Sequence, residues 1–126
     1  MDTSKLYIDM CRKAEEIQKQ WIPTMGDFTA TPSGYFNVIK FIESRGNEGA
    51  DFDDEDIWLP RQDQLQNVGW DHQGLKINKI QYTVYRISWV DELSIEEVFG
   101  SSLEQCWLRF IMSYKYSKQW NGKDWK

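Results

Sequence analysis

The sequence predicts an α+β fold, in which helices and strands interleave along one layered domain. Three observations lead to this fold class. Apolar residues recur at helical spacing over residues 6–21 and 103–114, they alternate at strand spacing over residues 80–89, and a turn containing Pro and Gly joins two short extended segments near residue 31. Because that hairpin argues against a purely parallel sheet, we expect mixed layers around one core. The length of 126 residues leaves room for a single domain over residues 1–126.

The N-terminal third predicts a helix followed by a hairpin. The helix extends over about residues 4–21, and Pro23 and Gly26 end it. The hairpin extends over residues 28–42, with Pro and Gly at 31–34 setting its turn. The apolar residues that share one face of the helix are Leu6, Met10, Ala14, Ile17 and Trp21, and the available N-caps are Asp2, Thr3 and Ser4.

A mobile acidic loop is expected over about residues 44–56. The chain has a formal net charge of −5, and residues 43–56 hold seven acidic side chains against Arg45. Such a run argues against non-specific nucleic-acid binding over the whole surface, because that affinity comes from neutralising phosphates. The run also departs from the EF-hand pattern, whose sixth and twelfth positions need Gly and Glu but here hold Asp56 and Gln62. We therefore expect a solvated loop rather than a calcium site.

A short helix is predicted in the middle of the chain. Residues 57–59 form a short apolar anchor, and Pro60 suits the first position of a helix over about residues 60–68. Leu65 and Val68 lie three residues apart on one face of that helix.

Residues 75–90 give the strongest strand signal, with a central strand over about residues 79–90. A change of parity near its start predicts a bulge or a tight turn at Asn78-Lys79. Apolar side chains on both faces are typical of a strand that is covered on both sides. They are Ile80, Tyr82 and Val84 on one face, and Tyr85, Ile87 and Trp89 on the other.

Two Ser-to-Glu capping boxes predict two helices near the C-terminus. The first box, residues 94–97, starts a short helix that Gly100 ends. The second box, residues 101–104, starts a long helix over about residues 101–118. The apolar stripe of the long helix consists of Leu103, Trp107, Phe110, Ile111 and Tyr114.

The sequence contains no motif for catalysis, a cofactor or a metal. It has one histidine, too few soft ligands for a zinc site, and it has no phosphate-binding loop and no placed nucleophile. Cys11 and Cys106 follow no CxxC pattern, so we expect two small buried hydrophobes. No apolar run reaches the ~18 residues of a membrane span, and residues 1–16 lack the apolar core of a signal peptide. We therefore expect a cytoplasmic protein with no cofactor, no metal and no membrane partner.

Eight residues are candidates for binding. Arg61, Gln62 and Gln64 form a polar recognition surface beside the indole of Trp58; the alternative is a solvated helix start with Trp58 as a core anchor. The other four lie near chain breaks and charges, and they are Trp70, Trp120, Lys123 and Trp125. Asn121-Gly122 offers a tight turn that would fold Trp125 back against Trp120, so we expect the tail to pack with at most one exposed indole.

Three segments resemble small uncharacterised proteins encoded in phages and prophages of low-G+C bacteria. They are residues 57–66 (IWLPRQDQLQ), 102–112 (SLEQCWLRFIM) and 115–125 (KYSKQWNGKDW). The resemblance implies a bacterial cytoplasm and a mobile genetic element. It implies no activity and assigns no role to a residue.

We expect a non-enzymatic binding or adaptor module that recognises a partner protein or forms a homo-oligomer. One alternative is a nucleic-acid-binding accessory protein, because tyrosines and tryptophans alternate with lysines over residues 114–126. Another is a small enzyme with a site around His72, in which Asp71 would orient the imidazole and Arg61 would lie close by.

Overall fold

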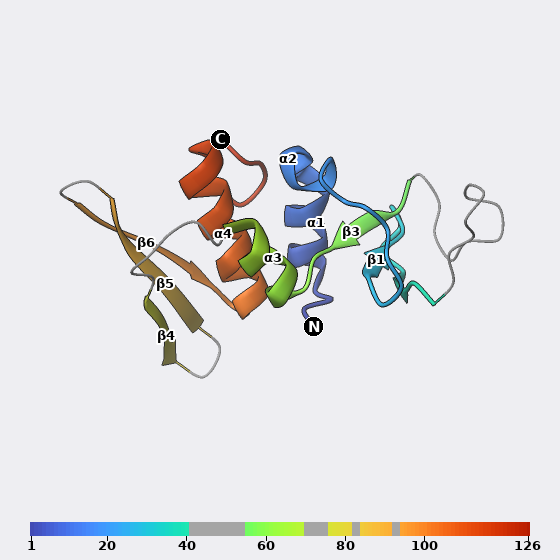
Figure 1. Ribbon diagram of the computed structural model, residues 1–126, viewed down its shortest axis with the longest axis horizontal. Coiled ribbons are helices and arrows are strands. Elements are labelled where there is room, and N and C mark those ends of the chain that lie inside the picture. The colour runs from blue at the N-terminus through green and yellow to red at the C-terminus, as the bar shows by residue number, and fades with distance from the viewer. Residues whose placement is uncertain (41–54, 70–75, 82–83, 92–93) are drawn as a thin grey trace. The chain divides into compact units, whose positions relative to one another are not determined.

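The computed structural model of the chain describes residues 1–40, 55–69, 76–81, 84–91 and 94–126. They form two compact units, an N-terminal unit over residues 3–61 and a C-terminal unit over residues 62–126 with Met1 and Asp2. Each unit combines helix with a small antiparallel sheet, which confirms the α+β fold class (Figure 1). The single domain stays a prediction. The acidic loop that we expected lies outside the described residues except for its last two positions.

The N-terminal unit begins with two short helices, α1 (Lys5–Lys13) and α2 (Glu15–Gln18). Ser4 caps α1 by accepting a hydrogen bond from the backbone N–H of Tyr7. One continuous helix over residues 4–21 was the wrong prediction, because Ala14 leaves the helical region with φ −84° and ψ 71°. The break is stabilised by the amide of Gln18, which donates to the carbonyl of Cys11 at the end of α1.

The sheet of the N-terminal unit has the order β2-β1-β3. The predicted hairpin is confirmed, with β1 (Phe28–Ala30) antiparallel to β2 (Phe36–Val38). Gly34 supplies the positive φ of +96° that the turn requires. The segment predicted as an apolar anchor is a third strand, β3 (Ile57–Leu59), which is fully buried and antiparallel to β1.

The C-terminal unit contains α3 (Gln62–Gly69) and the longer α4 (Leu103–Tyr116), which pack against each other. The helix predicted over residues 60–68 therefore starts two residues later than expected. The helix predicted over residues 101–118 is confirmed with slightly shorter ends. Its N-cap is Ser102, and Ser117 ends it in the left-handed region with φ 54°.

Three antiparallel strands complete this unit in the order β4-β5-β6. They are β4 (Lys76–Gln81), β5 (Val84–Asp91) and β6 (Ser94–Gly100). The single central strand over residues 79–90 was wrong, because β4 ends at Gln81 and pairs antiparallel with β5, which begins at Val84. The register shifts between Lys79 and Gln81, close to the bulge predicted at Asn78-Lys79.

The central strand β5 packs one of its faces against α4. Ile87 and Trp89 are buried under α4, and the ring of Trp89 meets that of Phe110 edge-on with centroids 4.8 Å apart. On the other face Val90 is 61% exposed. The other residues of that face, Val84, Arg86 and Ser88, are half-buried, so the predicted cover on both faces is met in full only on the side of α4.

The strand β6 stands where the sequence predicted a short helix over residues 94–100, so that prediction was wrong. All seven residues pair with β5, from Ser94 opposite Asp91 to Gly100 opposite Tyr85. A capping box stabilises a helix by about 1 kcal/mol, whereas pairing along a whole strand satisfies the hydrogen bonds of a full row of backbone groups. A pattern of neighbouring residues does not reveal such a pairing, because the partner strand lies elsewhere in the sequence. Ser94 does bond Glu96 over 3.1 Å, but inside a strand.

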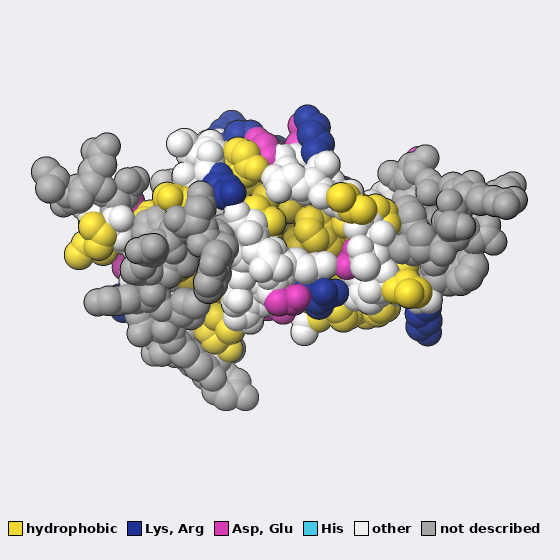
Figure 2. Space-filling view, viewed as in Figure 1, with side chains coloured by type: hydrophobic (Ala, Val, Ile, Leu, Met, Phe, Trp, Pro, Cys, Tyr) yellow, Lys and Arg dark blue, Asp and Glu magenta, His cyan; other side chains and the backbone are white. Residues whose placement is uncertain are grey.

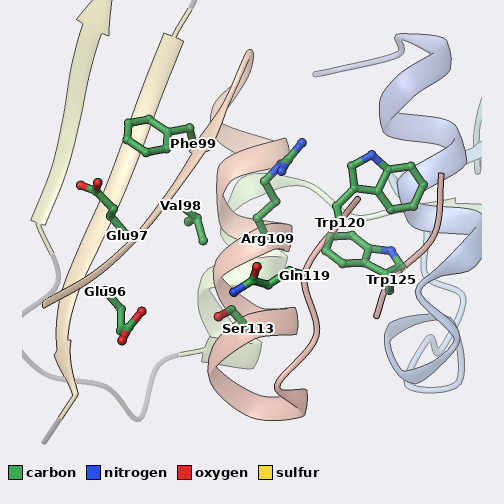
Figure 3. Close-up of a pocket in the computed structure, with 9 residues that line it drawn as sticks. All are labelled: Glu96, Glu97, Val98, Phe99, Arg109, Ser113, Gln119, Trp120 and Trp125. Atoms are coloured by element: carbon green, nitrogen blue, oxygen red, sulfur yellow. The ribbon is translucent and has the colours of Figure 1, made fainter. Parts of the chain in front are cut away.

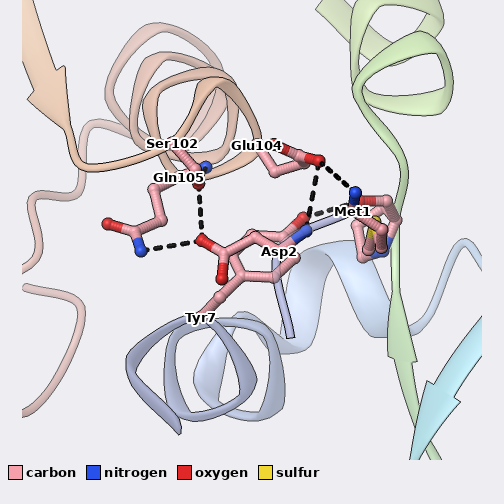
Figure 4. Close-up of polar contacts among 7 residues, drawn as sticks. Met1, Asp2, Tyr7, Ser102, Glu104 and Gln105 are labelled. Carbon is pink, nitrogen blue, oxygen red and sulfur yellow. Dashed lines mark hydrogen bonds and ion pairs between the residues drawn. The ribbon is translucent and has the colours of Figure 1, made fainter. Parts of the chain in front are cut away.

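Residues 1 and 2 join the C-terminal unit at the start of α4 (Figure 4). The carboxylate of Asp2 accepts hydrogen bonds from the Ser102 hydroxyl and from the Gln105 amide, and the backbone N–H of Asp2 donates to Glu104. The cysteines Cys11 and Cys106 are both buried and unbridged, as predicted. Within the described residues no helix is both long enough and apolar enough to span a bilayer.

Candidate functional site

The tail after α4 closes on itself through a short antiparallel turn. Two hydrogen bonds of 2.8 and 2.9 Å join the backbones of Gln119 and Lys126. The side-chain oxygen of Asn121 accepts from the backbone N–H groups of Lys123 and Asp124, and Gly122 takes a φ of +98°. The rings of Trp120 and Trp125 lie 5.2 Å apart, and they are 9% and 8% exposed. The prediction that this turn folds Trp125 against Trp120 is confirmed.

A cavity of about 190 Å³ lies between β6, α4 and this tail (Figure 3). We call it the β6–α4 cavity. It is lined by residues 96–99 of β6, by Arg109 and Ser113 of α4, and by Gln119, Trp120 and Trp125 of the tail. All three lining elements belong to the C-terminal unit. The turn at Asn121-Gly122 therefore builds one wall of the cavity.

The guanidinium of Arg109 is the cation of this cavity. Its Nε atom is buried and has no hydrogen-bond partner, and no described residue forms an ion pair with it. Burial lowers the pKa of Arg109, because desolvation penalises the charged form, and the nearby Cys106 opposes this effect only in part. An arginine keeps its charge even so, and it carries five N–H donors in a planar fork.

A second buried donor belongs to the same wall. The indole N–H of Trp120 has no acceptor among the described residues. In Figure 3 the guanidinium of Arg109 extends from α4 in the direction of the Trp120 ring. Ser113 and Gln119 add a hydroxyl and an amide to the lining. Two buried donors of the residues that line the cavity therefore have no acceptor among the described residues.

The two acidic residues of the cavity wall are exposed, and each already has a partner. Glu97 pairs with Arg86 of β5 at 3.7 Å, and Glu96 accepts a hydrogen bond from Ser94. Neither forms an ion pair with Arg109. The negative charge of the rim thus stands apart from the positive charge of the interior.

The free edge of β6 borders the same cavity. The strand β6 pairs with β5 on one side, and no other described strand pairs with it on the other side. Ile95 of β6 and its neighbour Val90 of β5 are directly opposite each other and are 76% and 61% exposed. Hydrophobic atoms are also visible among the polar surface in Figure 2. An open strand edge with apolar neighbours can pair with a further chain.

The candidate residues around residue 60 lie in two different units. In the N-terminal unit Trp58 is buried and stacks on Trp21 with ring centroids 6.3 Å apart, so it is a core anchor and not an exposed indole. Arg61 donates to the carbonyl of Gly26 and pairs with Asp27 at 3.6 Å. Gln62 and Gln64, at the start of α3, are half-buried in the C-terminal unit.

The remaining candidates divide between the cavity and the undescribed segments. Trp120 and Trp125 line the cavity, whereas Lys123 is exposed in the turn beside it. Trp70 lies outside the described residues, and so do Asp71 and His72.

The sequence analysis did not predict a role for Arg109, because it described this segment only by its apolar stripe. A signal was available: from Cys106 to Met112 every residue except Arg109 is apolar. A lone cation inside such a run must be desolvated or must face an opening. The residues of β6 were missed because the segment was assigned to a helix.

No protein-family model matches this chain, and no curated protein or solved structure shows significant similarity to it. Among the described residues no group of three or more His, Cys, Asp or Glu side chains could hold a metal ion. The geometry of the β6–α4 cavity is therefore the basis of the functional argument.

Proposed function

We propose that this chain is a non-enzymatic binding module that takes up an extended segment of a partner protein in the β6–α4 cavity. The observation that carries the proposal is the position of this cavity beside the free edge of β6. An added strand can gain backbone hydrogen bonds from an open edge and gain selectivity from the pocket next to it.

The size of the cavity favours a peptide over a free small molecule. Pockets for drug-sized ligands and cofactors measure about 300–1,000 Å³. The β6–α4 cavity measures about 190 Å³, or roughly six water volumes. It has room for an anchoring group, with the rest of the ligand lying along β6.

The setting of this module is part of the same proposal. We place it in the cytoplasm of a bacterial host, on a phage or prophage, on the resemblance of three segments to such proteins. The nucleic-acid alternative has less support, because Trp120 and Trp125 pack against each other and offer little ring surface to a base. The residues of the enzyme alternative, Asp71 and His72, lie outside the described part of the chain.

Selection from a random peptide library, followed by a binding assay with the selected peptides, tests the proposal. Ser113→Trp fills the cavity from α4, whereas Lys115→Trp introduces the same side chain at an exposed position of the same helix. We expect the selected peptides to bind the unmodified protein and Lys115→Trp alike, and to lose affinity for Ser113→Trp. Failure to select any peptide, or equal binding to both variants, would overturn the proposal.

A further inference from the structure

Arg109 lines the β6–α4 cavity, and no described residue forms an ion pair with its guanidinium. Arg109 Nε and Trp120 Nε1 are buried and have no partner among the described residues. Buried donors are rarely left without a partner. An arginine fork matches a carboxylate with two parallel hydrogen bonds.

The charge of the cavity favours a carboxylate over a phosphate. Arg109 is the one cation among the residues that line the cavity, and Glu97 is already paired with Arg86. A phosphate dianion brings two negative charges to one guanidinium, and a nucleic-acid strand would do so repeatedly. A single negative charge is balanced by Arg109 alone.

The shape of the site selects the end of a chain over an internal acidic residue. The tail turn forms one wall of a cavity of about 190 Å³, and the open edge of β6 offers the route toward it. A bound C-terminus leaves the cavity in one direction only. An internal Asp or Glu would need space for the peptide backbone to leave the cavity in two directions. Val98 lines the wall and suits an apolar last side chain, and the rim acid Glu96 suits a basic residue earlier in the segment.

We infer that the partner segment enters with its C-terminus first and that Arg109 binds its terminal carboxylate. This inference rests on the proposed function and names the ligand of that site. The expected partner is therefore a protein whose chain ends in a short extended tail with an apolar last residue and a basic residue before it.

Three synthetic versions of one labelled peptide test the inference on the full chain. The peptide has a basic residue, a Val-Leu end and either a free carboxylate, a C-terminal amide, or a C-terminal amide after an added Asp. We expect the free acid to bind about 10- to 100-fold more tightly than the plain amide, because a hydrogen-bonded charge pair is lost in the amide. The Asp-amide version is expected to bind as weakly as the plain amide.

Two variants test whether the carboxylate of the peptide binds Arg109. Arg109→Gln should reduce the affinity for the free acid to that for the amide and leave the amide unchanged. Arg109→Lys keeps the charge but loses the fork, so it should give an intermediate loss. The comparison of free acid and amide on the unmodified protein needs no variant and stays decisive if either variant fails to fold.

The outcomes separate this inference from the proposed function. Equal binding of free acid and amide, with both lost in Ser113→Trp, would overturn the C-terminal carboxylate and leave the binding module standing. Tight binding of the Asp-amide version would assign the anchor to a side chain and also overturn the inference. Displacement of the peptide by single-stranded DNA at about 0.15 M salt would favour the nucleic-acid alternative and contradict it.

Discussion

The hydroxyl of Ser102 donates a hydrogen bond of 2.5 Å to the carboxylate of Asp2, across 100 positions of the sequence. The same hydroxyl accepts from the backbone N–H of Gln105, and the Gln105 side chain donates to the same carboxylate oxygen at 2.8 Å. Asp2 thus places a negative charge at the N-terminus of α4, where the helix dipole is positive. A residue near the start of the chain completes the cap of a helix near its end.

Removal of this contact should destabilise the C-terminal unit. We expect Asp2→Ala to lower the free energy of unfolding by about 1–2 kcal/mol, because it takes away two hydrogen bonds and a favourable charge. Ser102→Ala should cost about 1 kcal/mol, and the double variant should cost less than the sum of the two. Urea unfolding of all three variants measures this coupling.

Asp9→Ala is the control, since it removes an exposed pair with Arg12 and should change stability by less than about 0.5 kcal/mol. Strict additivity of the two substitutions would contradict the expectation.

Gly100 permits the close approach of β6 to the first turn of α4. A Cβ atom at this position would lie 2.7 Å from the backbone nitrogen of Cys106 and 3.0 Å from the carbonyl oxygen of Ser102. Because both are backbone atoms, Gly100→Ala requires the strand and the helix to separate, and we expect it to cost about 1–3 kcal/mol. Thermal unfolding of Gly100→Ala beside Ser101→Ala tests this. The exposed neighbour should stay within about 0.5 kcal/mol of the unmodified protein. Equal melting temperatures for the two variants would show that the contact is not tight.

Much of the fold could be predicted because its signals are local. The helix α4 follows from the 3.6-residue spacing of its apolar stripe and from Ser102, and the first hairpin follows from its Pro and Gly turn. The closing of Trp125 on Trp120 follows from Asn121-Gly122, which fixes the turn whatever lies around it. In each case the residues that determine the structure lie within a few positions of it.

The errors arose where distant pairing decides the structure. The Ser94–Glu97 box predicts a helix, but the segment has a partner strand in β5. The residues between Gln81 and Val84 are Tyr and Thr, which favour strands, so nothing marked the point at which one predicted strand becomes two. Arg109 is a candidate because β6 and the tail form a cavity together with α4. The sequence pattern around Arg109 does not show which segments lie beside it in the fold.

Asp27 organises the loop between α2 and β1 in the N-terminal unit. Its carboxylate is 2% exposed and accepts from the indole of Trp21 at 2.9 Å and from the backbone of Thr24 at 3.0 Å, while Arg61 pairs with it at 3.6 Å. We expect Asp27→Ala to cost about 2–4 kcal/mol, since it removes a buried acceptor that serves the Trp21 indole, the Thr24 backbone N–H and Arg61.

Arg61→Ala is the matched comparison, and it should cost about 1 kcal/mol or less, because the arginine is partly exposed. Urea unfolding gives the two stabilities, and the indole N–H resonance of Trp21 should shift strongly in Asp27→Ala only. A larger loss for Arg61→Ala than for Asp27→Ala would reverse this ranking.

Burial raises the pKa of the Cys106 thiol from 9.0 to about 11, with the backbone of Ile87 and the charge of Arg109 opposing the rise in part. The folded protein therefore keeps this thiol protonated at pH values where the unfolded chain ionises it. The stability that the protonated thiol contributes is fully present below pH 9 and is lost as the pH rises from about 9 to about 11, by up to roughly 3 kcal/mol.

The measurement is urea unfolding under reducing conditions between pH 8 and pH 10.5, on the unmodified protein and on Cys106→Ala. Every other ionisable group is present in both proteins, so the difference between the two free energies of unfolding isolates the thiol. We expect Cys106→Ala to be the less stable protein at pH 8, because it leaves a small cavity, and the gap to narrow steadily as the pH rises. A gap that stays constant up to pH 10.5 would show that the thiol ionises equally well in the folded chain.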